Sequence, residues 1–109
     1  HYFVDWKGKQ RDMHVIWDGT LWDSYYDWSF RDMAYLVDTA SPEEIAEITA
    51  GTVYDYAECS ARDSWPAVSA YTEGDVLPRS YATDMRPLLF SQLRNGGYRL
   101  AAIFNEIFR

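Results

Sequence analysis

The chain has 109 residues, 48% of them hydrophobic and 25% charged, which allows one buried core and excludes two independent domains. Ten lysines and arginines stand against seventeen aspartates and glutamates, and the net charge of −7 argues against binding nucleic acid mainly through phosphate electrostatics. Any chemistry on phosphate groups would therefore need a metal ion. No run of about eighteen apolar residues occurs, so we expect a soluble protein with no membrane partner.

The first half of the chain predicts a β-hairpin followed by helices. Residues 1–6 are aromatic and β-branched and lead into Lys7-Gly8-Lys9, where glycine allows the tight reversal of a hairpin. Asp12 is placed to cap a helix whose apolar positions are spaced by three and four: Met13, Ile16, Trp17 and Leu21. A second helical stripe with the same spacing follows, formed by Trp22, Tyr26, Phe30, Met33 and Val37.

The second half predicts further helices. Ser41 and Glu44 form a capping box with Pro42 in the first turn, which predicts a helix over 42–50 with Gly51 at its C-terminal cap. Residues 52–70 are expected to be helical but interrupted at Pro66, and 72–78 to form a loop. A long helix is predicted over 80–108. Gly96 and Gly97 lie in its middle, so either this helix breaks there or another segment approaches its backbone closely.

One pair of residues has the character of metal ligands. His14 and Asp18 are four residues apart in a predicted helix, so the imidazole and the carboxylate lie on one face and can converge on a cation. Zinc accepts such nitrogen and oxygen ligands. The alternative is a surface pair or a capped core histidine. The other histidine, His1, is terminal, and we interpret it as a chain end and not as a ligand.

Other candidate residues favour structural roles. Cys59 is the single cysteine, so the chain contains no internal disulfide; it indicates either a reducing compartment or a bridge to another segment. No histidine lies near it in sequence, which argues against a Cys-His nucleophile. Gly96-Gly97 lacks the flanking residues of a phosphate loop. Arg99 could bind a carboxylate or phosphate, but a structural ion pair is the simpler interpretation.

Three segments together resemble a known family. Residues 4–18 resemble the hairpin and helix of the class I zinc-dependent single-strand-specific nucleases, the mung bean nuclease type, which open that helix with Asn-Leu-His-x-x-Trp-Asp; Asp12-Met13 replaces Asn-Leu here. Residues 96–101, Gly-Gly-Tyr-Arg-Leu-Ala, resemble the family's closing helix. Residues 55–60 resemble an internal segment more loosely. The resemblance implies a mainly α, phospholipase C/nuclease-like fold: half of a helical bundle with a short N-terminal β-hairpin.

The resemblance also implies an activity and site residues. Complete family members hold three zinc ions, hydrolyse single-stranded DNA and RNA to 5′-phosphorylated products, and often have 3′-nucleotidase activity. By this resemblance His14 and Asp18 ligate one zinc. We expect residues 1–109 to be the C-terminal portion of a single nuclease domain, with the N-terminal half as its missing partner and Cys59 bonded to a cysteine there. The isolated chain would then be inactive. A secreted or lysosome-like, extracellular location is implied.

Two other functions remain open at this stage. A phospholipase-C-like phosphodiesterase belongs to the same superfamily, although the Gly-x-Arg-Leu-Ala ending favours a nuclease. The second is a non-catalytic, acidic helical interaction module in which His14 and Asp18 only cap and pair. Zinc binding that is lost with His14→Ala would count against that module.

Overall fold

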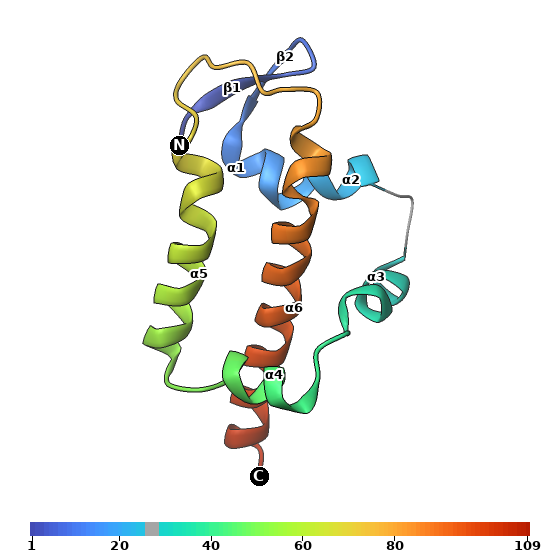
Figure 1. Ribbon diagram of the computed structural model, residues 1–109, viewed down its shortest axis with the longest axis vertical. Coiled ribbons are helices and arrows are strands. Elements are labelled where there is room, and N and C mark those ends of the chain that lie inside the picture. Colours follow the sequence, from blue (N-terminus) through green and yellow to red (C-terminus); the bar gives the residue numbers. More distant parts are fainter. Residues whose placement is uncertain (26–28) are drawn as a thin grey trace. The chain divides into compact units, whose positions relative to one another are not determined.

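The structure, a computed structural model, describes residues 1–25 and 29–109 (Figure 1). The chain is mainly helical with a short hairpin at its N-terminus, as the sequence predicts. Its elements are β1 (Phe3–Trp6), β2 (Lys9–Asp12), α1 (Met13–Val15), a π-helical turn (Ile16–Thr20), α2 (Leu21–Tyr25), α3 (Phe30–Val37), α4 (Pro42–Ile48), α5 (Val53–Ser69) and α6 (Tyr81–Ile107). The described residues form two compact units, 1–25 with 64–89 and 29–63 with 90–109, and we describe each separately.

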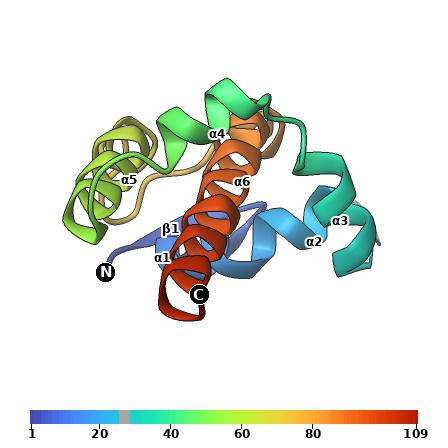
Figure 2. The ribbon, with the colours of Figure 1, turned by 90° about the horizontal axis from the view of Figure 1, so that it is seen from below.

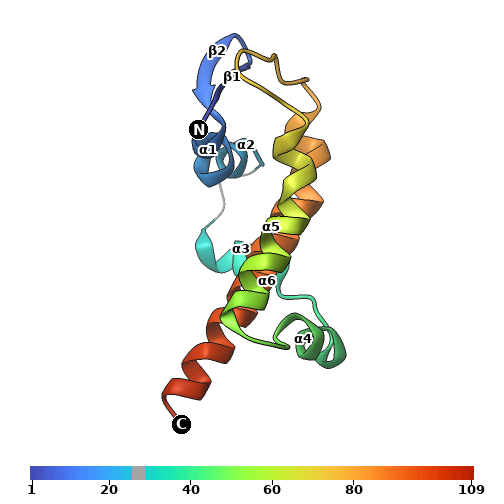
Figure 3. The same cartoon turned by 90° about the vertical axis from the view of Figure 1, so that its left-hand side faces the viewer.

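The first unit begins with the predicted hairpin. β1 and β2 pair antiparallel, with Trp6 opposite Lys9. The turn residues Lys7 and Gly8 both have positive φ, 53° and 79°, the pattern of a two-residue type I′ turn. The loop after α5 runs beside β1 (Figure 3), and the Leu77 amide donates to the Asp5 carbonyl at 2.9 Å. The loop therefore covers one edge of the hairpin.

The core of the first unit combines residues from the hairpin, the following turns and the start of α6. Val4, Ile16, Leu21 and Tyr81 are all at most 1% exposed. Val4 and Trp6 are two positions apart in β1 and therefore share the buried face of the hairpin. This core confirms the helical face predicted after Asp12, and it anchors the residues that carry the His14–Asp18 pair.

The stripe predicted from Trp22 to Val37 does not lie on one continuous helix. Ser29 has an extended backbone (ψ 156°), and its hydroxyl accepts a hydrogen bond from the Asp32 amide, so it caps a separate helix, α3. A serine cap competes with helix continuation because its side chain replaces a backbone acceptor. Tyr26, also predicted on this stripe, lies outside the described residues.

The second unit contains the predicted capping box. The Ser41 hydroxyl accepts from the Glu44 amide, and the Glu44 carboxylate accepts from the Ser41 amide at 2.7 Å. α4 ends at Ile48, two residues earlier than predicted, and Gly51 follows with φ 89°. α4 lies beside α6 (Figure 2), where the Arg99 guanidinium donates to the Ile48 carbonyl at 3.0 Å.

α5 and α6 each extend unbroken across residues that usually weaken helices. The predicted interruption at Pro66 is wrong, because α5 continues through it. Proline removes the amide that would bond to the Arg62 carbonyl, so the helix continues here with one backbone hydrogen bond fewer. α6 continues through Gly96 and Gly97, and a β-carbon added at either would meet no described atom within 4 Å. None of the described helices is long and apolar enough to cross a membrane.

Candidate metal site

The predicted pair, His14 and Asp18, is brought together at the start of the first helical segment. The Asp12 carboxylate accepts from the His14 amide at 2.9 Å and caps that segment. The His14 Nε2 atom then lies 2.9 Å from the Asp18 Oδ2 atom. Both side chains are well exposed, at 63% and 68%, so both can reach a ligand from solvent.

A π-helical turn carries Asp18. This turn spans Ile16–Thr20 and begins on Ile16, which is fully buried, and the buried Leu21 follows it directly. A π turn needs more residues per revolution than an α turn, and single π turns within helices are frequent at functional sites. The spacing of apolar residues in the sequence did not distinguish this turn from an ordinary α-helix.

Trp17, the residue before Asp18, is held by a buried tyrosine. The Trp17 indole N–H donates to the Tyr81 hydroxyl oxygen at 3.0 Å, and the two rings meet edge to face. Burial is the main cause that raises the pKa of Tyr81 to about 12, while the hydrogen bond from Trp17 acts in the opposite direction. The phenol is therefore neutral at physiological pH and fixes the turn that bears Asp18. We did not predict a role for Tyr81, because no local pattern links residues so far apart.

A shallow groove of about 370 Å³ lies against His14. It is lined by His1, Tyr2, Met13, His14, Trp17, Ser64 and Val68. The His1 Nδ1 atom lies 3.0 Å from the Asp12 carboxylate, and its ring centroid lies 5.3 Å from that of His14. His1, which the sequence analysis set aside, therefore lies next to the candidate site.

The donor set fits zinc in part. Tetrahedral zinc with ligand distances of about 2.0–2.2 Å places two donor atoms roughly 3.3–3.6 Å apart, so the 2.9 Å pair needs to open only slightly. An imidazole nitrogen and a carboxylate oxygen are both ordinary zinc ligands. Within the described part of the chain, however, no third histidine, cysteine or acidic side chain joins them. His14 and Asp18 can therefore hold a zinc ion only together with donors from elsewhere.

Cys59 and Arg99 belong to the second unit. Cys59 is a free, half-buried thiol, and Arg62 donates to its sulfur at 3.4 Å. Arg99 donates to the Ile48 carbonyl and to the Ser60 hydroxyl (3.2 Å), and its guanidinium lies 5.2 Å from the centre of the Tyr56 ring. Arg99 thus has the structural role expected of it, although neutral oxygens take the place of the expected ion-pair partner.

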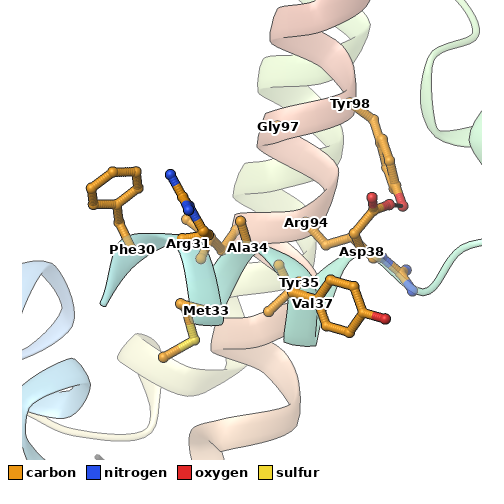
Figure 4. A pocket seen from close by; sticks show the side chains of 11 residues that line it. Phe30, Arg31, Met33, Ala34, Tyr35, Val37, Asp38, Arg94, Gly97 and Tyr98 are labelled. Atoms are coloured by element: carbon orange, nitrogen blue, oxygen red, sulfur yellow. Dashed lines mark hydrogen bonds between the residues drawn. The ribbon is translucent and has the colours of Figure 1, made fainter. Parts of the chain in front are cut away.

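The second unit also contains an apolar groove between α3 and α6, with a volume of about 650 Å³ (Figure 4). Its apolar lining includes Phe30, Met33, Val37 and Leu93. At one end the Tyr98 hydroxyl donates to the Asp38 carboxylate, and this bond is the main cause that raises the pKa of Tyr98.

Comparison with known proteins agrees with the resemblance seen in the sequence. The model of the S1/P1 nuclease family matches residues 1–109. Endonuclease 2 of Arabidopsis thaliana is similar at 25% identity over 96% of this chain, and the chain spans about two fifths (41%) of that relative. No solved structure matches significantly. These findings favour the nuclease expectation over the phospholipase alternative.

Proposed function

We propose, because this chain belongs to the S1/P1 nuclease family, that it is the C-terminal portion of a zinc-dependent nuclease domain. The complete enzyme would hydrolyse single-stranded DNA and RNA to 5′-phosphorylated products, with 3′-nucleotidase activity. The observation that carries the proposal is the 2.9 Å approach of the His14 and Asp18 donor atoms on an exposed face.

In this proposal His14 and Asp18 are ligands of one of three zinc ions. The chemistry that zinc supplies when bound is activation of a water molecule and neutralisation of the charge that builds up on the phosphate. His14 must present an unprotonated Nε2, and Asp18 must be ionised. Asp12 fixes the backbone under His14, and the hydrogen bond from Trp17 to Tyr81 fixes the turn under Asp18. The chain's own contribution is thus a pre-positioned pair of donors.

The exposed apolar side chains support the idea that another part of the domain covers this chain. Phe30 is 88% exposed, and Leu100, Phe104 and Ile107 of α6 are each more than half exposed. The three α6 residues are spaced four and three apart and therefore share one helix face, and an exposed apolar face of this kind usually marks an interface. The covering segment would be the N-terminal half of the same enzyme, with Cys59 bonded to a cysteine in it. A secreted or lysosome-like location would allow such a bond.

The decisive experiment measures zinc content and hydrolysis of single-stranded DNA in the complete enzyme. We expect His14→Ala and Asp18→Ala each to remove about one zinc per molecule and to lower the rate more than about 100-fold. Asp23→Ala is the matched control, because Asp23 is an exposed acidic residue of the following helix, and it should change neither quantity. Full zinc content and full activity in His14→Ala would refute the ligand assignment.

The disulfide is tested separately by intact mass under non-reducing and reducing conditions. A Cys59→Ser variant should abolish any covalent link to the remaining part of the enzyme, if that part is a separate chain, or add one free thiol, if it is the same chain. A free-thiol count that falls by one in Cys59→Ser would instead show that Cys59 is unpaired, as it is within the described residues.

A further inference from the structure

The tip of the β-hairpin holds a lysine in a backbone conformation that lysine rarely adopts. Lys7 has φ 53°, and among the described residues it is the one non-glycine with positive φ. Type I′ turns favour asparagine, aspartate or glycine at this position. Strain of this kind persists mainly where a side chain serves a function. The position of Lys7 therefore points to a use for its ammonium group.

Four of the ten basic side chains lie on the hairpin and the loop beside it. Lys7, Lys9, Arg11 and Arg79 are all exposed, and none takes part in an ion pair within the described part of the chain. The nearby carboxylates are engaged by backbone amides: that of Asp5 accepts from Gly8, that of Glu73 from Phe3 and that of Asp75 from Thr72.

The charge of this region also differs from that of the whole chain. Residues 1–12 and 70–79 contain four basic and four acidic side chains, whereas all 109 residues sum to −7. The hairpin region is therefore neutral overall, and a polyanion meets less repulsion there than the net charge of the whole chain implies.

A groove of about 580 Å³ lies between the hairpin tip and the loop beside it. Its lining includes the buried Trp6 and Leu77, with Lys7 on the hairpin side and Arg79 on the loop side. The Lys7 ammonium lies 5.1 Å from the centre of the Trp6 ring, so it is already held over an apolar floor. Backbone hydrogen bonds from Asp5 to Asp75 (2.8 Å) and from Leu77 to Asp5 (2.9 Å) fix the two walls.

We propose that this hairpin groove binds the phosphate backbone of the single-stranded substrate, with Lys7 and Arg79 each contacting a phosphate; the inference rests on the proposed nuclease function. β2 leads directly into the helical segment that bears His14, and the five residue steps from Lys9 to His14 span at most roughly 17 Å. A strand a few nucleotides long would thus reach both places. Contacts to phosphates hold any base sequence equally.

The test is fluorescence anisotropy of a labelled oligothymidylate with the 109-residue chain, measured at several salt concentrations in EDTA. The double variant Lys7→Gln/Arg79→Gln loses two cations; the control Arg31→Gln/Arg109→Gln loses two exposed cations of the second unit. We expect the slope of log K against log salt to fall by about 1.4 in the double variant and affinity at low salt to fall about tenfold. The control should keep the wild-type slope.

Lys7→Asn tests whether misfolding, and not the loss of the lysine charge, explains weaker binding. Asparagine suits the positive φ of the turn better than lysine, so this variant should unfold at an equal or higher temperature and still bind the oligonucleotide more weakly. Two results would overturn the proposal that the hairpin groove binds the phosphate backbone. One is a double variant with the wild-type salt slope, and the other is a wild-type chain that shows no binding even at about 20 mM salt.

The experiments distinguish an error in the groove proposal from an error in the nuclease proposal. Oligonucleotide binding in EDTA does not depend on zinc, so it tests the hairpin groove separately from the metal site. If the hairpin variants lose no affinity but His14→Ala loses zinc in the complete enzyme, only the groove is wrong. If the hairpin variants lose affinity for the oligonucleotide but His14→Ala keeps its zinc, the groove proposal is supported and the assignment of His14 as a zinc ligand is wrong.

Discussion

Tyr81→Phe tests the buried hydrogen bond on which the candidate metal site rests. Phenylalanine keeps the ring that packs in the core but removes the acceptor of the Trp17 indole N–H. The Tyr81 hydroxyl also faces the Ala67 carbonyl at 3.4 Å and the Met13 sulfur at 3.8 Å, and the variant loses both contacts. The substitution therefore leaves one partly buried donor and one carbonyl without this partner.

The expected cost follows from those contacts. An unsatisfied buried donor costs about 1–3 kcal/mol, and because Trp17 is only partly buried we take the lower half, about 1–2 kcal/mol. For a domain near this size, each kcal/mol lowers the melting temperature by about 4–8 °C. Thermal unfolding followed by far-ultraviolet circular dichroism measures this loss. Tyr35→Phe is the control, because Tyr35 is 87% exposed and should be nearly neutral.

The same residue gives a pH dependence with a defined sign. The pKa of Tyr81 in the folded chain, about 12, is above the ordinary value of 10.0, so the folded state binds this proton more tightly than the unfolded state. The resulting stabilisation is complete below pH 10 and is lost as the pH rises from 10 to 12. After discounting for solvent screening we expect the loss to be at most about 2 kcal/mol. Tyr81→Phe should not show this loss, and an identical alkaline profile in variant and wild type would refute the reasoning.

Three further substitutions test the second unit and the hairpin. Arg99→Lys keeps the positive charge but loses the planar set of guanidinium donors that bond to Ile48 and Ser60. It should lower the free energy of unfolding, measured in urea, by about 1–2 kcal/mol. An unchanged free energy of unfolding would show that these two hydrogen bonds do not stabilise the fold. Gly51→Ala should lower the melting temperature more than Gly8→Ala does. Both glycines have positive φ, but only at Gly51 would the new β-carbon meet another residue, the Asp55 side chain at 2.6 Å, so equal melting temperatures would contradict this prediction. Gly97→Ala should stabilise the 109-residue chain by about 1 kcal/mol, because the position is helical and open, yet lower the melting temperature of the complete enzyme if another segment covers this face.

Local signals predicted much of the fold. The Ser41–Glu44 capping box lies within four residues, so its sequence pattern was sufficient to place the start of α4. The long apolar stripe of α6 likewise predicted a helix over 80–108, but it left open a break at Gly96 and Gly97, and the structure shows that the helix continues there. The break at Ser29 was missed because the spacing of apolar residues continues across it, while the capping bond there depends on one side-chain rotamer. The continuity of α5 through Pro66 was missed because proline usually interrupts a helix, and the local sequence does not show that this helix tolerates the loss of one hydrogen bond.

In the candidate metal site, too, local relations between residues were predictable from the sequence and distant contacts were not. The His14–Asp18 pair was predictable because a separation of four residues on a helix is a local relation, and the π turn between them did not abolish it. The partner of Trp17 was not predictable, because Tyr81 is 64 residues away and meets it only after the core has formed. A third zinc donor would likewise have to come from a distant segment, and none is present within the described residues.

The proposal that another part of the domain covers this chain accounts for both the incomplete donor set and the exposed apolar face. A two-donor site binds zinc weakly, and an exposed row of apolar side chains on α6 is unfavourable in water, yet a single covering segment would correct both. Gly96 and Gly97 fit this explanation, since glycine weakens a helix and is retained where a backbone is approached closely. The hairpin groove differs, because its walls and floor come entirely from the first unit. By these proposals the isolated chain should bind single-stranded nucleic acid but not cleave it.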